Sequence, residues 1–74
     1  MTVKVKLYGD YLKYGPEEVY VDLNEGATVE DLLNRFSIVE RNYIIILVNL
    51  KRAWFDERLS DGDVVSVFSP VGGG

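Results

Sequence analysis

The final stretch of the chain reads Asp61-Gly62-Asp63-Val64-Val65-Ser66-Val67-Phe68-Ser69-Pro70-Val71-Gly72-Gly73-Gly74. Its Asp-Gly-Asp triplet predicts a turn, and the alternation that follows predicts a strand from Val64 to Phe68. A proline and three glycines then end the sequence. Ordering glycines has a high entropic cost, so a folded core gains nothing from such an ending. We therefore interpret residues 70–74 as an extended tail, of which residues 72–74 alone would reach about 10 Å into a partner's pocket.

The composition restricts the chemistry that the chain itself could perform. Its 74 residues are 47% hydrophobic, which predicts a single globular domain over residues 1–74. There is no cysteine or histidine, so thiol nucleophiles, thiolate metal sites and imidazole bases are excluded. The net charge of −4 argues against nucleic acid as a partner. We expect no metal site and no bound cofactor.

Targeting signals are also missing from the sequence. No apolar run approaches the roughly 20 residues of a membrane span, and no signal segment opens the chain. We therefore expect a cytoplasmic protein that has no membrane partner.

Four other stretches have the pattern of strands. Alternation predicts strands at 3–7 and 19–23, and the apolar run 43–48 predicts a central strand covered on much of both faces. Residues 52–55 are expected to form a short strand that returns beside it. Residues 9–16 contain Gly9-Asp10 and Gly15-Pro16 and are expected to form a loop.

One helix is expected between the second and third strands. Thr28 is a good N-cap, with Asp31 three residues later in a weaker form of the capping box. An apolar stripe then predicts a helix from about Val29 to Phe36. Leu59 lies in a polar segment and is expected to fill the core from a single turn.

The element order is strand, strand, helix, strand, short strand, strand. We expect the first two strands to pair antiparallel and the first and last strands to pair parallel, with the helix across one face. Five residues would then face the helix: Val3, Val5, Leu7, Val65 and Val67. Six would lie on the opposite face: Lys4, Lys6, Tyr8, Val64, Ser66 and Phe68.

Tyr8 and Phe68 would be close together on that opposite face, beside the tail. Such an aromatic patch suits the docking of a partner, although an ordinary exposed surface is the plainer interpretation. The acidic pairs Glu17-Glu18, Asp56-Glu57 and Asp61/Asp63 could be imagined as acid–base pairs or metal ligands. Because all of them lie in turns or at element ends, we interpret them as solvated turn residues.

Taken together, these features resemble those of a known protein family. The residues that carry the resemblance are Val5-Lys6-Leu7-Tyr8-Gly9, Gly26-Ala27-Thr28-Val29-Glu30-Asp31-Leu32-Leu33, Val48-Asn49, Leu59, Asp61-Gly62-Asp63-Val64-Val65 and Pro70-Val71-Gly72-Gly73-Gly74. The whole chain resembles the ubiquitin-like sulfur carriers of the MoaD/ThiS family. The resemblance implies an α+β protein with the β-grasp fold, in which a mixed sheet of four to five strands packs against one main helix and ends in a flexible tail.

The resemblance also implies a mechanism. A ubiquitin-activating-type adenylyltransferase would use ATP to adenylate Gly74, and a sulfur donor would convert the adenylate to a thiocarboxylate. Gly72 and Gly73 would let the backbone enter the active sites of partners. The aromatic pair Tyr8 and Phe68, together with Pro70 and Val71, would contact those partners. The chain would then be a co-substrate, not an enzyme, and its sulfur would pass to a molybdopterin synthase large subunit or a thiazole synthase.

Some positions depart from the family pattern. Leu50 follows Val48-Asn49 where Gly is frequent, which makes Leu50 a residue that we expect to be exposed for contact. Ser69-Pro70 replaces a frequent Pro-Pro. The three final glycines favour the thiamine branch, whereas the first hairpin favours the molybdopterin branch, which we prefer. Two alternatives stay open. One is a protein modifier joined through Gly74 to lysines, and the other is a non-covalent binding module that uses the Tyr8/Phe68 face.

Overall fold

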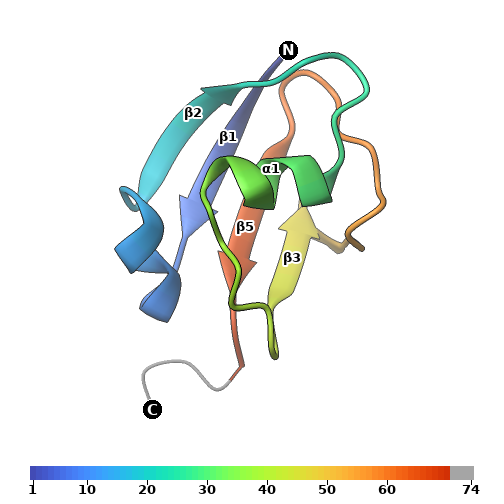
Figure 1. Ribbon diagram of the computed structural model, residues 1–74. Helices are drawn as coiled ribbons and strands as arrows, with labels where there is room; N and C mark the ends of the chain where they lie inside the picture. Colours follow the sequence, from blue (N-terminus) through green and yellow to red (C-terminus); the bar gives the residue numbers. More distant parts are fainter. Residues whose placement is uncertain (71–74) are drawn as a thin grey trace.

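The computed structural model of the protein describes residues 1–70. Within them lie β1 (Thr2–Leu7), η1 (Gly9–Tyr14), β2 (Glu18–Asp22), α1 (Val29–Arg35), β3 (Ile45–Val48), β4 (Lys51–Arg52) and β5 (Val64–Phe68). The strands form one mixed sheet in the order β2-β1-β5-β3-β4, and α1 crosses one face of it (Figure 1). β1 pairs parallel with β5 and antiparallel with β2, as expected from the sequence. This arrangement is the β-grasp fold.

The core lies between the sheet and α1. Val3, Val5 and Leu7 of β1 are fully buried, and Val65 and Val67 of β5 are at most 1% exposed. From the helix, Val29, Leu32 and Leu33 meet them with no exposed surface. The predicted division of β1 and β5 into a helix-facing side and an outer side is confirmed.

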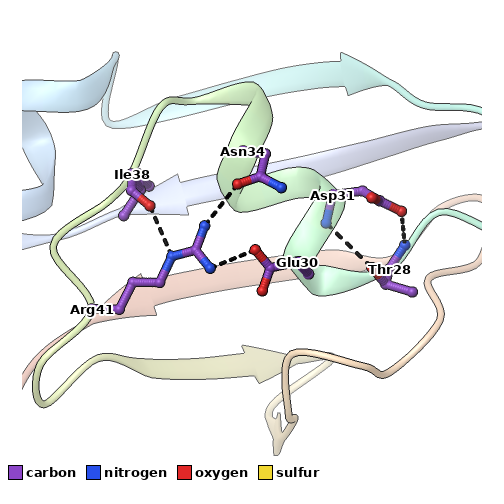
Figure 2. A network of polar contacts seen from close by, with 6 residues as sticks. All are labelled: Thr28, Glu30, Asp31, Asn34, Ile38 and Arg41. Atoms are coloured by element: carbon purple, nitrogen blue, oxygen red, sulfur yellow. Dashed lines mark hydrogen bonds and ion pairs between the residues drawn. The ribbon is translucent and has the colours of Figure 1, made fainter.

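The N-terminus of α1 is held by a capping box and by the loop before β5. Thr28 Oγ1 accepts a hydrogen bond from the Asp31 amide (3.2 Å), and the Thr28 amide donates to Asp31 Oδ2 (2.9 Å) (Figure 2). The amides of Val29 and Glu30 donate to the carbonyls of Glu57 and Phe55, both at 2.9 Å. These bonds satisfy amides that a helix leaves unpaired at its start.

The C-terminus of α1 ends in a Schellman motif. Ser37 has a left-handed φ of 59°, its amide donates to the Asn34 carbonyl (3.0 Å), and the Ile38 amide donates to the Leu33 carbonyl (3.0 Å). Leu33 and Ile38, at the two positions whose apolar side chains accompany this motif, are both fully buried in the core.

The side chain of Arg41 links the segment between α1 and β3 to the helix (Figure 2). Its Nε donates to the Ile38 carbonyl (2.8 Å), Nη1 pairs with Glu30 Oε2 (2.6 Å), and Nη2 donates to Asn34 Oδ1 (3.0 Å). Its guanidinium also lies 5.5 Å from the centre of the Phe55 ring. One side chain therefore links the connector, the helix and the loop after β4.

Four predicted strands and the helix have different bounds in the structure. β1 and β2 each begin one residue earlier than predicted, β2 ends at Asp22, and α1 ends at Arg35; the other two strands differ more. The short strand is Lys51–Arg52 and not 52–55, because the carbonyl of Phe55 turns away to cap α1. β3 begins at Ile45 and not at residue 43, because Tyr43 has a left-handed φ of 65° and the Ile44 amide donates to the Arg41 carbonyl. The outer face of β3 is only half-buried.

The segment predicted as a loop at residues 9–16 contains the 3-10 helix η1. Tyr11 is buried there at 5% exposure, and its ring stacks on that of Tyr14 with centroids 6.1 Å apart. Burial, and then the neighbouring Tyr14, raise the pKa of Tyr11. Leu59 is 4% exposed, so its predicted place in the core is confirmed.

Candidate partner-binding face

The outer face of the sheet is organised in rows by the strand register. One row runs across four strands and contains Lys6 (β1), Ser66 (β5), Leu47 (β3) and Arg52 (β4). The next row, toward the end of β5, contains Tyr8, Phe68 and Ile45. We call the surface formed by Tyr8, Leu47, Leu50 and Phe68 the docking face.

Tyr8 and Phe68 are in contact, as the sequence predicted. Their ring centroids are 6.2 Å apart and the ring planes are inclined at 81°, an edge-to-face arrangement. The Tyr8 amide donates to the Val67 carbonyl (3.1 Å), which fixes Tyr8 beside the end of β5. Tyr8 is 46% exposed, so its ring is partly available to a partner. That the pair binds a partner stays a prediction.

A depression of about 370 Å³ lies on this face. Its lining comprises Tyr8, Leu47, Leu50, Ser66, Phe68 and Ser69. Leu47 was not among the site residues predicted from the sequence, whereas the expected exposure of Leu50 is confirmed at 85%. The signal that could have found Leu47 is the pairing of β3 with β5, which places Leu47 opposite Ser66.

The chain leaves the sheet at the docking face. β5 ends at Phe68, and Ser69 and the exposed Pro70 follow it. The predicted site residues Val71, Gly72, Gly73 and Gly74 lie outside the described residues. The predicted contact residues Tyr8, Phe68 and Pro70 therefore all lie around the point from which the tail continues.

An ion pair lies at the β2 side of the outer face. Lys4 Nζ is 2.8 Å from Glu18 Oε1, and the same ammonium lies 5.8 Å from the centre of the Tyr20 ring. The hydrogen bond between them raises the pKa of Lys4 and lowers the pKa of Glu18. Both side chains are solvent-accessible, so this ion pair contributes little to the stability of the fold.

The acidic turn residues have structural partners. Asp61 Oδ1 accepts from the Thr2 amide (2.7 Å), Asp63 Oδ2 accepts from the Ser60 amide (2.7 Å), and Asp63 Oδ1 accepts from Asn49 Nδ2 (2.8 Å). Within residues 1–70, no cluster of three or more potential ligand side chains is placed to hold a metal ion. Over the same residues, every helix is too short or too polar to cross a membrane.

The five-stranded sheet, the crossing helix and the chain end that leaves beside an aromatic pair define a small ubiquitin-like protein. Residues 5–74 match the model of the ThiS family, and the chain belongs to this family. No curated protein sequence matches the chain. Membership makes it a sulfur carrier or a protein modifier, and members of the family are carriers without catalytic activity of their own.

Several solved structures are similar to it. The putative molybdopterin converting factor subunit 1 from Pyrococcus furiosus is 32% identical, with a TM-score of 0.80 over 96% of this chain and 99% of that chain. The small archaeal modifier protein 1 of Haloferax volcanii is 27% identical, with a TM-score of 0.80 over 95% of this chain and 98% of that chain. In a structure from Helicobacter pylori, 25% identical with a TM-score of 0.65 over the whole of both chains, subunits 1 and 2 of the molybdopterin-converting factor form a complex.

Proposed function

We propose that this protein is a sulfur carrier whose Gly74 carboxylate becomes a thiocarboxylate, and that it delivers its sulfur to a molybdopterin or tungstopterin synthase. The observation that carries the proposal is the end of β5: Phe68 meets Tyr8 on the docking face, and the residues after Pro70 continue from that point. A partner that holds this face would have the last glycines within reach of its active site.

The chemistry needs an activating enzyme. A carboxylate is a poor electrophile, so a ubiquitin-activating-type adenylyltransferase joins it to the α-phosphate of ATP and releases pyrophosphate. A sulfide equivalent from a sulfur donor then attacks the acyl carbon, a carbon–sulfur bond forms, and AMP leaves. The chain contains no cysteine that could carry the sulfur instead. Its own residues bind the enzyme and present the carbonyl, while ATP is bound by the partner.

The similarities support one choice of sulfur acceptor. The subunit 1 from Pyrococcus furiosus, at 32% identity, supports the molybdopterin branch over the thiamine branch. The complex from Helicobacter pylori supports a large synthase subunit as the second partner. Both partners would use the same docking face in turn.

Mass spectrometry of the intact protein tests the proposal. Co-expression with the adenylyltransferase encoded in the same genome should yield a species about 16 Da heavier, since sulfur replaces one oxygen. Appending one alanine after Gly74 should abolish this species while leaving the fold intact. A gain of 16 Da in the extended protein would contradict a terminal thiocarboxylate.

A second candidate function is protein modification through Gly74. The 27% identity to the small archaeal modifier protein 1 favours it, and the activation step would be the same. Adducts on lysine side chains that survive reducing agent would support this candidate. Their absence, together with the 16 Da species, would support the sulfur carrier.

A further inference from the structure

A second depression, of about 320 Å³, lies at the end of the sheet where β5 ends. One wall is η1 and the other is the segment between α1 and β3, residues 36–44 (Figure 1). We call it the tyrosine cleft, because Tyr11, Tyr14 and Tyr43 line it. Ser69 lines both this cleft and the depression on the docking face, so the two adjoin where the chain leaves β5.

The hydroxyl of Tyr11 opens into the tyrosine cleft. The residue is only 5% exposed, and its ring stacks on that of Tyr14. Within residues 1–70 this hydroxyl forms no hydrogen bond, yet every fully buried side-chain oxygen or nitrogen there has a partner. The hydroxyl must therefore reach solvent, and the cleft is the opening that Tyr11 lines. A buried phenol normally finds a partner for its hydroxyl, so this one is available to a ligand.

Two carboxylates make the cleft negatively charged. Asp10 lies on η1 and Glu40 on the facing segment. Burial, then Tyr14, then the carboxylates of Glu40 and Asp10 raise the pKa of Tyr11, so both carboxylates act on its hydroxyl. Within residues 1–70 neither forms an ion pair, and the cation of the lining is Lys13, 5.4 Å from the centre of the Tyr14 ring. Two carboxylates and one ammonium leave one negative charge for a ligand to balance.

The wall that carries Glu40 and Tyr43 is held in place by the fold. Nη1 of Arg41 pairs with Glu30 Oε2 of α1 (2.6 Å), so this guanidinium is engaged with the helix. The Ile44 amide donates to the Arg41 carbonyl (3.2 Å) and closes a turn around Tyr43. Tyr43 has a left-handed φ of 65°, and its side chain is 72% exposed. Backbone strain of this kind is concentrated at binding sites.

We propose that the tyrosine cleft binds the guanidinium of an arginine side chain from a partner protein. The carboxylates of Asp10 and Glu40 accept its N–H groups, and the hydroxyl oxygen of Tyr11 accepts another. The planar group stacks on the rings of Tyr14 and Tyr43. Arginine fits better than lysine, because its rigid fork reaches several acceptors at once and stacks on aromatic faces. The volume is at the lower end of the range for ligand pockets, roughly 300–1,000 Å³, which suits a single side chain.

Charge selects this occupant over two others. The carboxylate of the chain's own Gly74 would be repelled by Asp10 and Glu40. An apolar side chain would leave those carboxylates and the Tyr11 hydroxyl without hydrogen bonds. A bound arginine would lie beside Ser69, where the tail begins. The inference goes beyond the proposed function and does not depend on it, because the cleft would bind arginine whether or not Gly74 carries sulfur.

NMR titration of the isotope-labelled full chain with N-acetyl-arginine methylamide tests the proposal. The amide resonances of residues 10–14 and 40–43 should shift together and reach saturation. The citrulline analogue has nearly the same shape without the charge, and should bind about tenfold more weakly or worse. Equal affinity for the two compounds would overturn the proposal, and so would shifts centred on the acidic pairs Glu17-Glu18 or Asp56-Glu57.

Three exposed side chains provide matched variants. Glu40→Gln should weaken arginine binding by about threefold or more, since one of two carboxylates is lost. Lys13→Gln should strengthen it by about threefold, because the ammonium that competes for the cleft is removed. Glu57→Gln makes the same change of charge outside the cleft and should leave the affinity unchanged. An equal loss in Glu40→Gln and Glu57→Gln would overturn the proposal, since only the net charge would then matter.

Tyr11→Phe separates binding from folding. It removes only the hydroxyl, which has no partner within residues 1–70, so the midpoint of unfolding in urea should not fall. The affinity for the arginine compound should fall by about threefold or more, since a hydrogen bond to a charged group is lost. Unchanged affinity would overturn the proposed geometry. Nuclear Overhauser contacts from Gly72, Gly73 or Gly74 to the Tyr43 ring in the free chain would make the tail the occupant and overturn the partner's arginine.

Discussion

The ring of Tyr8 meets the ring of Phe68 edge-on, with 6.2 Å between the centroids, and this contact joins the end of the first strand to the end of the last. Edge-to-face pairs contribute about 0.5–1.5 kcal/mol beyond the area they bury. The same two rings therefore hold the strand ends together and form the centre of the docking face.

We expect Tyr8→Ala to weaken binding to the adenylyltransferase by about tenfold or more, because an aromatic anchor at the centre of the face is lost. Tyr8→Phe should bind nearly as well as wild type, since the ring remains. Calorimetry on the three proteins checks this. If Tyr8→Ala kept wild-type affinity, the docking face would lie elsewhere on the molecule.

Ser37→Gly should stabilise the protein by about 1 kcal/mol. Ser37 adopts φ 59° at the end of α1, in the position where glycine relieves the crowding of Cβ. Equilibrium unfolding in urea would measure the change. Ser37→Ala serves as the control, because it keeps the Cβ, and should give no such gain. Equal stability of the glycine and alanine variants would show that the left-handed backbone carries no strain here.

Arg41→Ala should destabilise the protein by about 1–2 kcal/mol, since it leaves the Ile38 carbonyl, Glu30 and Asn34 without this partner. Arg41→Lys keeps the charge but cannot reach three acceptors with one planar group, so it should recover only part of the loss. Thermal unfolding of both variants checks the order. Full recovery by lysine would mean that charge alone matters at this position.

The Lys4–Glu18 pair predicts a pH dependence. Because the pKa of Glu18 is lowered in the folded state, its contribution to stability exists above the unfolded-state pKa and is lost as the pH falls through the folded-state value. The pKa of Lys4 is raised, so its contribution exists below the unfolded-state pKa and is lost as the pH rises through the folded-state value.

NMR titration of the Glu18 carboxyl group measures the first of these effects. In Lys4→Met the pKa of Glu18 should rise toward that of a free glutamate, and the stability of the variant should change less in acid than that of wild type. A Glu18 pKa that is identical in the two proteins would rule out the pair as the cause of the shift.

Much of the fold could be predicted because local patterns and packing agree. The alternation in β1 and β5 decided which side chains face α1, and all five predicted residues are buried. The capping signal at Thr28 and Asp31 placed the start of α1 at Val29. The parallel pairing of β1 with β5, which we expected from the element order, brings Tyr8 into contact with Phe68. No short-range signal in the sequence predicts this contact.

What could not be predicted depends on contacts between distant segments. The strand expected at residues 52–55 is cut short because the Phe55 carbonyl bonds to the Glu30 amide, more than twenty residues away. The burial of Tyr11 depends on how η1 folds against the sheet. The left-handed backbone at Leu50 follows Asn49, which bonds to Asp63 and Val64, and its one sign in the sequence is that Leu50 stands where the family often has Gly.

The parallel pair of β1 and β5 also bears on how the protein is made. β1 comes from the first residues of the chain and β5 from the last described ones, so the middle of the sheet closes only after Phe68 has been synthesised. A nascent or truncated chain that stops before that residue lacks half of its aromatic pair. Formation of the proposed docking face therefore depends on the last described strand, because Tyr8 has no aromatic partner until Phe68 has been added to the chain.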